Sequence, residues 1–437
     1  MTPPASLSAT VRRVAPWQAA HRGLTALLPL LLATWFGRSV ETDLYNLLAA
    51  LFTLAGSLVF ASFQDSALVP IAIDVQRHEP AQYPRFVGAL FTYTALLASA
   101  LALLIGAGAW LWFRGRAGAG APLLAPMVAG FAIYLPILAL RSLAAALLAA
   151  RFRFLPDAFA GGIGVLVTLA IISCTRGAGL WPVPFALAAG ELAAAAWLTA
   201  TLHGTGVRVA PTLARPAPLL RFVGLVWSEI GGATVVRVNP LVDQMMARAL
   251  GIVGGGTMLR LSGDLASFPA ALLSSTFLSV LLSHLAAAGA DGRRHELRRT
   301  VTGTVRAVAV VFGAAALALF VVRVPLVALA YGRGAMDAAA LARMAHLLPY
   351  HLVGLVPFGI LLVLARAHVS IGNSRILVSM GALNAAANLA LNLAFVGPLG
   401  LEGIALATSV VNGLVAWVFW IRLRARLRAA APQRRRA

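Results

Sequence analysis

The stretch RFVGLVWSEIGGATVVRVNPLVDQMMARAL, residues 221–250, is long enough to cross a bilayer and yet carries charged side chains. At about 1.5 Å per residue, a helix of this length spans the ~30 Å hydrocarbon layer. Glu229, Arg237 and Asp243 would lie at different depths in that layer, where an unpaired charge costs several kcal/mol. Pro240 would interrupt the helix, and such breaks are tolerated where a helix lines protein or water.

Two interpretations of these polar groups are open. They either form internal salt bridges that hold helices together, or they line a translocation cavity. The second interpretation predicts that Arg237 binds an anionic substrate. Glu229 and Asp243 would then pair with arginines or carry a coupling ion, H⁺ or Na⁺.

Composition assigns the chain to the polytopic membrane proteins. Hydrophobic residues make up 60% of its 437 residues and charged residues 11%, and the mean hydropathy is +0.87. The net charge of +21 comes from arginine, since lysine is absent. The single cysteine, Cys174, excludes a cysteine metal site, and no HExxH or P-loop motif occurs. We therefore predict no enzymatic activity, no metal, no cofactor and no nucleic-acid partner.

Hydropathy and length predict an all-α protein of twelve spans in two six-helix lobes. The predicted spans are 23–36, 44–72, 87–113, 123–149, 158–175, 181–202, 220–249, 257–285, 302–330, 341–366, 376–396 and 400–421. A proline-rich link divides them six and six. The predicted parts are an N-terminal lobe (1–205), a cytoplasmic linker (206–218), a C-terminal lobe (219–424) and a basic tail (425–437).

Arginines are unequally distributed between the two sets of links. Those after even-numbered spans hold Arg77, Arg85, Arg151, Arg153, Arg208, Arg215, Arg293, Arg294, Arg298, Arg299 and Arg375. The opposite links hold Arg38, Arg114, Arg116, Arg176 and Arg333. The arginine-rich side should be the cytoplasm. The basic tail is either a topology signal or a surface for anionic headgroups, at ~1 kcal/mol per residue.

Several stretches in both lobes resemble one family. They are LVLARAHVSIGNSR (362–375), NAAANLALNLAFVGPLGLEGIALATSVVN (384–412), ATWFGRSVETDL (33–44), SALVP (66–70) and GDLASFPAALLSSTFLSVLLSHL (263–285). They resemble the MurJ/MviN lipid II flippases of the MOP exporter superfamily, which also holds polysaccharide flippases and MATE exporters. The resemblance implies a MOP/MATE-like fold and a bacterial inner-membrane protein.

The family's cavity residues are only partly matched. Arg22 falls on the first cavity arginine of the family, and Asp43 on the aspartate of its T-D pair. The other cavity arginines of the family fall on Leu28, Gly56, Ser57 and Asp264. These departures raise the question of whether the substrate has changed.

Further arginines can be proposed as substitutes. Arg260 lies one helical turn before Asp264, so the two form an internal ion pair or Arg260 points into the cavity. Arg141 lies roughly 15 Å along the fourth span from Arg151, and an unpaired charge at that depth is costly. A guanidinium suits a diphosphate because its planar fork donates two hydrogen bonds.

Other polar residues favour structural roles. Asp43 opens the second span, where it would neutralise the positive end of the helix dipole. Asn384, Asn388 and Asn392 recur every four residues, a pattern that favours interhelical hydrogen bonds over a cavity stripe. His368 is expected at the membrane interface.

The sequence therefore predicts a flippase that moves a polyprenyl-diphosphate-linked saccharide outward by alternating access. The glycan would be lipid II-like or an exopolysaccharide or O-antigen unit. The substrate would meet Arg22, Arg141, Arg237 and Arg260. A MATE-like cation-coupled drug exporter, and a non-transporting scaffold that recruits envelope glycan synthesis proteins, are the alternatives.

The arginine distribution yields a topological prediction: both termini face the cytoplasm and Arg333 faces outward. Cysteine labelling in intact cells should modify a cysteine at position 333 and spare one at position 437. Labelling of position 437 from outside would reverse the orientation and the direction of transport.

Overall fold

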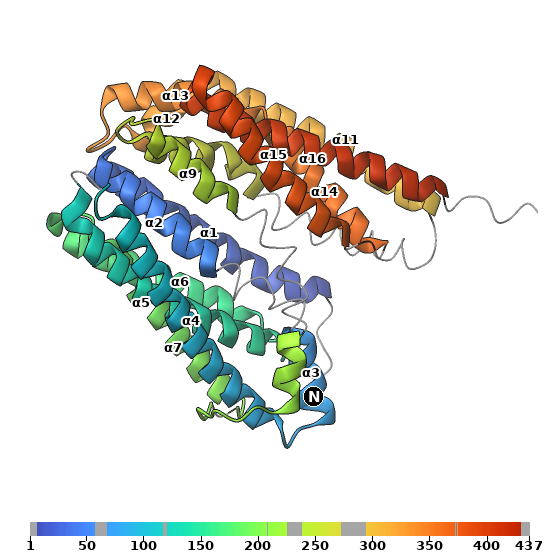
Figure 1. The fold of residues 1–437 in the computed structure, drawn as a ribbon. Helices are drawn as coiled ribbons and strands as arrows, with labels where there is room; N and C mark the ends of the chain where they lie inside the picture. The colour runs from blue at the N-terminus through green and yellow to red at the C-terminus, as the bar shows by residue number, and fades with distance from the viewer. Residues whose placement is uncertain are drawn as a thin grey trace, which may run out of the picture. The chain divides into compact units, whose positions relative to one another are not determined.

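The computed structural model describes residues 7–56, 68–116, 120–207, 209–224, 238–271, 294–371, 373 and 375–429 (Figure 1). Within these ranges every regular element is helical. The chain forms two compact units, residues 1–233 and 234–437. Their boundary falls beyond the linker expected at 206–218, inside the predicted seventh span. Glu229 and Arg237 lie outside the described residues.

The helices of the first unit are α1 (Leu7–Phe36), α2 (Val40–Gly56), α3 (Val69–His78), α4 (Tyr83–Phe113), α5 (Ala121–Ala149), α6 (Leu155–Thr175), the short η4 (Arg176–Ala178) and α7 (Val183–His203). Residues 217–224 are also helical. The second unit holds α9 (Asn239–Ala249), helical residues 255–271, α11 (Arg294–Val321), α12 (Arg323–Tyr331), α13 (Ala338–Leu352), α14 (Leu355–Ser370), α15 (Arg375–Leu399) and α16 (Leu401–Ala429).

Among the described residues, seven helices are long and apolar enough to cross a membrane, or eight if the bent pair α13 and α14 is one span. They correspond to eight of the twelve predicted spans. The predicted spans 44–72, 220–249 and 257–285 each include residues outside the described ranges. The predicted first span is the C-terminal half of α1.

Two predicted spans are interrupted in the structure. The predicted span 302–330 breaks at Val322, just before a helical turn that contains Pro325, where a missing backbone N–H is tolerated. The predicted span 341–366 bends by 40° between α13 and α14. Gly354 lies at this bend, and a Cβ there would come within 2.6 Å of the Ser409 Oγ. Helix packing therefore places the bend where a glycine allows close approach.

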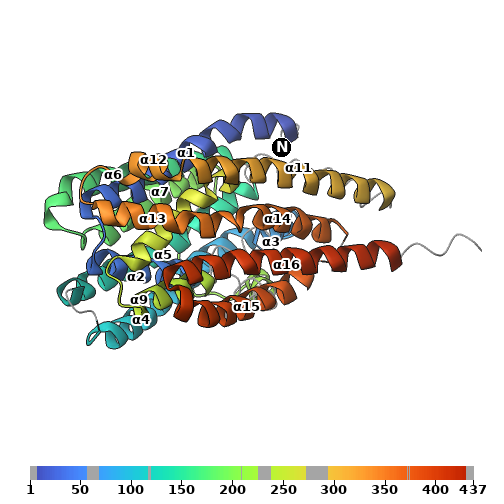
Figure 2. The same cartoon turned by 90° about the horizontal axis from the view of Figure 1, so that it is seen from above.

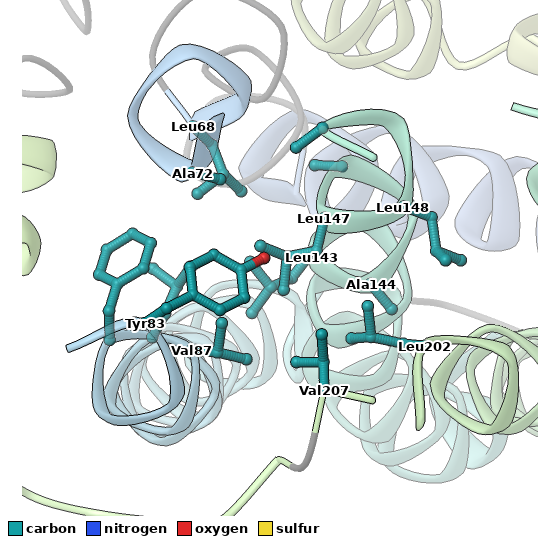
Figure 3. Close-up of a cluster of buried hydrophobic side chains, with 14 of the residues drawn as sticks. Leu68, Ala72, Tyr83, Val87, Leu143, Ala144, Leu147, Leu148, Leu202 and Val207 are labelled. Carbon is teal, nitrogen blue, oxygen red and sulfur yellow. The ribbon is translucent and has the colours of Figure 1, made fainter. Parts of the chain in front are cut away.

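The core of the first unit lies where α3, α4, α5 and α7 meet (Figure 3). Tyr83 points its ring between Leu143 of α5 and Val87 of α4, and Leu147 and Leu202 close the cluster. All five side chains are at most 5% exposed. The alanine-rich end of α5 brings its backbone close to its neighbours here, as small residues do in membrane helix packing.

Glycines bring α6 and α7 together at one crossing. A Cβ on Gly190 would overlap the Thr168 hydroxyl and the Gly164 carbonyl oxygen. Thr168 donates its hydroxyl to the carbonyl oxygens of Gly164 and Ala186, at 2.9 and 3.2 Å. Gly164 and Gly190 therefore allow close packing of the two helices, as small residues at membrane helix crossings usually do.

The inter-lobe linker is attached to α4. The Ala210 carbonyl oxygen occupies the space that a Cβ on Gly88 would need. The Tyr93 hydroxyl donates to the carbonyl oxygen of Leu213 at 2.8 Å. The linker is therefore part of the first unit rather than a free tether.

The start of the predicted seventh span is also held by the first unit. Arg221 donates to Asp74 Oδ2 at 3.2 Å and to Glu79 Oε1 at 2.5 Å, at the end of α3. The end of the same span, α9, belongs to the second unit. The predicted seventh span therefore begins in the first unit and ends in the second.

In the second unit, α16 packs along α14 and α15 (Figure 2). His368 is fully buried between α14 and α16, with Nε2 at 3.0 Å from the Phe419 carbonyl oxygen and Nδ1 at 3.0 Å from Asn373 Nδ2. These two hydrogen bonds compensate the burial of the imidazole, and His368 lies in the last turn of α14. At the far end of α16, Glu402 pairs with Arg343 of α13 at 3.0 Å.

The α6–α7 crossing yields a stability prediction. Gly190→Ala should lower the thermal midpoint in detergent, because overpacking costs about 1–3 kcal/mol and exceeds the ~1 kcal/mol helix-propensity gain. Gly162→Ala is the matched control, since a Cβ there meets nothing within 4 Å. Equal midpoints for the two variants would contradict this account of the crossing.

Candidate functional site

A ladder of polar side chains joins α9 to α15 and α16 in the second unit. Asn239 and Asp243 lie one turn apart on α9. Asn239 donates to Asn384 Oδ1 at 2.6 Å, and Asn392 donates to Asp243 Oδ1 at 2.7 Å. The Thr408 hydroxyl of α16 lies 3.4 Å from Asp243 Oδ2. The interhelical hydrogen bonds predicted for the asparagine face are confirmed.

Asn388 lies at the centre of this ladder. Its Oδ1 accepts from Asn392 at 3.0 Å, and its Nδ2 donates to Thr408 at 3.3 Å. Asn388 and Asn392 are 0% exposed, and Asn392 Oδ1 is buried with no hydrogen-bond partner among the described residues. Leaving a buried acceptor without a hydrogen bond costs about 1–3 kcal/mol of stability. A hydrogen-bond donor or a cation bound at Asn392 Oδ1 would remove that cost.

Asp243 has an unusual partner set for a buried acid. Within the described part of the chain its partners are amide and hydroxyl groups, and no ion pair is formed there. Neutral groups stabilise a negative charge less than a guanidinium does. A carboxylate among oxygen-bearing side chains can take a proton or a hard cation, for which oxygen is the preferred ligand. The described residues contain no group of three or more His, Cys, Asp or Glu side chains arranged to hold a metal ion.

Arg141 of α5 is paired with two carboxylates in the first unit. Its Nη2 lies 3.0 Å from Asp157 Oδ1 of α6, and its Nε lies 3.7 Å from Glu191 Oε2 of α7. The side chain is 18% exposed. Acidic partners from two neighbouring helices therefore compensate the charge that Arg141 would otherwise hold unpaired within the span.

Arg260 and Asp264 form the ion pair that their spacing predicts. Nε of Arg260 lies 3.9 Å from Asp264 Oδ2, longer than a hydrogen bond. The side chains are 40% and 48% exposed. This long, exposed contact is compatible both with an internal ion pair and with an Arg260 that points into a cavity.

The remaining predicted residues are dispersed. Arg22 is exposed on α1. Asp43 is buried in the first turn of α2, the position expected of a residue that interacts with the helix dipole. The structure does not describe Glu229 or Arg237.

Two acids in the first unit were missed in the sequence analysis. Asp157 and Glu191 are the partners of Arg141, and Glu191 is the lone charged residue of the predicted span 181–202. An ionisable residue inside a span suggests a functional site by default, and this signal was available in the sequence.

The sequence and the architecture of this chain are similar to those of known membrane transporters. A family model described as "Lipid II flippase MurJ" matches residues 32–435. A protein of Vibrio cholerae serotype O1 named "Probable lipid II flippase MurJ" is 26% identical over 231 residues, which are 53% of this chain and 41% of that relative. The aligned region thus spans less than half of the relative's length.

Solved structures agree on the fold. A lipid II flippase MurJ in an inward closed conformation matches with a TM-score of 0.77 and 17% identity, over 94% of this chain and 87% of that one. An inward-facing multidrug resistance MATE family transporter of the MOP superfamily matches with a TM-score of 0.62 and 14% identity, over 92% and 98%. The predicted fold class and family are confirmed. The chain is a polytopic membrane protein that belongs to the lipid II flippase MurJ family.

Proposed function

We propose that the protein is a flippase that carries a polyprenyl-diphosphate-linked saccharide across the bacterial inner membrane. The family match over residues 32–435 is the observation that carries the proposal. The division into two compact units supports alternating access, in which two halves move around a site. In the orientation expected from the arginine distribution, transport runs from the inner to the outer leaflet.

The proposed substrate contacts are arginines. Arg22 and Arg260 have exposed side chains, and Arg237 is predicted at mid-depth in the seventh span. Arg141 is compensated by Asp157 and Glu191, so we expect it to contribute less to substrate binding. A diphosphate would receive charge-assisted, two-pronged hydrogen bonds from these guanidinium groups.

We further propose that Asp243 binds the coupling ion, H⁺ or Na⁺. Its carboxylate, the Thr408 hydroxyl and the unpartnered Asn392 Oδ1 offer oxygen ligands in one buried place. Asp243 lies on α9, which continues the span that joins the two units. Occupancy of this site would therefore act on the connection between the units.

A MATE-like exporter is the second candidate. It draws support from the fold, since MATE transporters match with TM-scores of 0.56 to 0.63. The match to MurJ has the higher TM-score, 0.77. Transport of an organic cation by the reconstituted protein, with no movement of a lipid-linked saccharide, would favour this candidate.

The substrate arginines can be tested in reconstituted vesicles. Arg22→Ala and Arg237→Ala should each weaken binding of a fluorescent polyprenyl-diphosphate saccharide roughly 10-fold to 150-fold, the equivalent of ~1.5–3 kcal/mol. Lysine should restore binding only in part, because it lacks the planar fork. Flipping is measured as protection of the saccharide from a membrane-impermeant quencher.

Arg77→Ala is the control, because Arg77 is exposed at the end of α3, outside the proposed site. Unchanged flipping in both Arg22→Ala and Arg237→Ala would contradict the anionic-substrate proposal. If a variant with all proposed substrate arginines replaced also preserves function and the localisation of glycan synthesis proteins, the scaffold alternative gains support.

The coupling proposal predicts a different phenotype for Asp243→Asn. The amide preserves the size of the side chain and removes its charge, so flipping should slow while substrate binding persists. Na⁺ or acid should raise the thermal midpoint of the parent protein, since a ligand at 100 times its Kd adds about 2.7 kcal/mol. The variant should not respond to either. If Asp243 only pairs with an arginine, the variant should be destabilised instead. Equal flipping rates and equal midpoints would rule out both roles.

A further inference from the structure

Asp157, Glu191 and Arg141 form a polar cluster in the first unit, with two carboxyl groups and one guanidinium. Arg141 is the one guanidinium in contact with the carboxylates of Asp157 and Glu191 among the described residues. With both acids ionised, the three side chains carry a net negative charge. A net charge among apolar helices is costly, and protonation of one acid removes that cost.

The geometry indicates which acid takes the proton. Asp157 Oδ1 accepts a hydrogen bond from Arg141 at 3.0 Å, and its side chain is 43% exposed. Glu191 Oε2 lies 3.7 Å from Arg141 Nε, and neither buried atom has a hydrogen-bond partner within the described part of the chain. The ionised form of Glu191 is therefore poorly compensated, whereas that of Asp157 is well compensated.

Helices packed around Glu191 present few other titratable groups. α5 presents Tyr134 together with Arg141, and α6 presents Asp157. Tyr45 of α2 lies within electrostatic reach of Tyr134. These groups leave no second cation beside Glu191 in the described part of the unit.

α1 adds a histidine to the outer end of the cluster. His21 lies within electrostatic reach of Arg141 and Asp157, and next in sequence to Arg22. Its imidazole occupies the space that a Cβ on Gly161 would need. Gly161 lies one turn beyond Asp157 on α6, so the glycine seats the ring beside the exposed carboxylate.

The titratable groups form a path into the unit. Glu191 lies in the middle of α7, whereas Asp157 lies in the first turn of α6 and is accessible. The arginine-rich link at 151–153 precedes α6, so this end is the cytoplasmic one in the expected orientation. A proton can therefore reach Glu191 from the cytoplasmic side, past His21 and Asp157.

We propose that Glu191 is a proton-binding site of the first unit, charged and discharged through Asp157 and His21, and separate from the ion site at Asp243. Protonation of Glu191 leaves Arg141 in a neutral pair with Asp157. Deprotonation of Glu191 draws Arg141 toward the Glu191 carboxylate. His21 transmits this exchange to α1, which bears the proposed substrate contact Arg22. The site itself stands on the geometry, and only its part in transport rests on the proposed flippase function.

The direct test is an infrared pH titration of the substrate-free, full-length protein. A protonated carboxyl has a carbonyl band that its ionised form lacks. Several carboxyls of the parent protein lose this band as the pH rises, and one of these titrating bands should be missing from Glu191→Gln but present in Asp243→Asn. If Glu191→Gln retains every titrating band of the parent, the proposal is overturned, whether or not the protein flips lipids.

Transport supplies the second readout, with a matched glycine pair. Gly161→Ala should displace His21 and shift the dependence of flipping on cytoplasmic-side pH, whereas Gly162→Ala should leave it unchanged because a Cβ there meets nothing within 4 Å. Identical pH profiles for the two glycine variants would overturn the path through His21. A normal titration without any flipping would support the proton site and contradict the flippase function.

Discussion

The interior of this protein depends on the cost of placing charge among apolar helices. Each described charge deep in a unit meets a specific partner: Arg141 meets two carboxylates, Glu402 meets Arg343, and Asp243 meets amides and a hydroxyl. Such contacts are strong only where several helices supply the groups together. They therefore tie α5 to α6 and α7 in one unit, and α9 to α15 and α16 in the other.

The two units use different chemistry for this purpose. The first uses an arginine between acids, so its charge balance changes with a single proton. The second uses a carboxylate in an amide ladder, which is closer to an ion ligand set. The proposed proton site lies near His21 on α1, the helix that carries Arg22. The proposed ion site at Asp243 lies on α9 in the second unit.

Close packing by small residues makes these polar contacts possible. Gly164 and Gly190 bring α6 and α7 together beside Glu191, and Gly161 makes room for His21. Gly88 lets the linker lie against α4, which attaches the first turns of the seventh span to the first unit. The boundary between the units falls at residues 233 and 234, within the predicted seventh span rather than in the linker.

The sequence by itself determined the class, most spans and the family, because hydrophobic runs of fixed length and family motifs are local properties. It also determined that Asn384, Asn388 and Asn392 share a face and that Arg260 and Asp264 can pair, since both follow from helical periodicity. The tertiary structure decided the partners of Arg141, the burial of His368 and the attachment of the linker. These depend on residues far apart in the chain, such as Arg141 with Glu191 or Asp243 with Asn392, and no local spacing encodes which helices lie side by side.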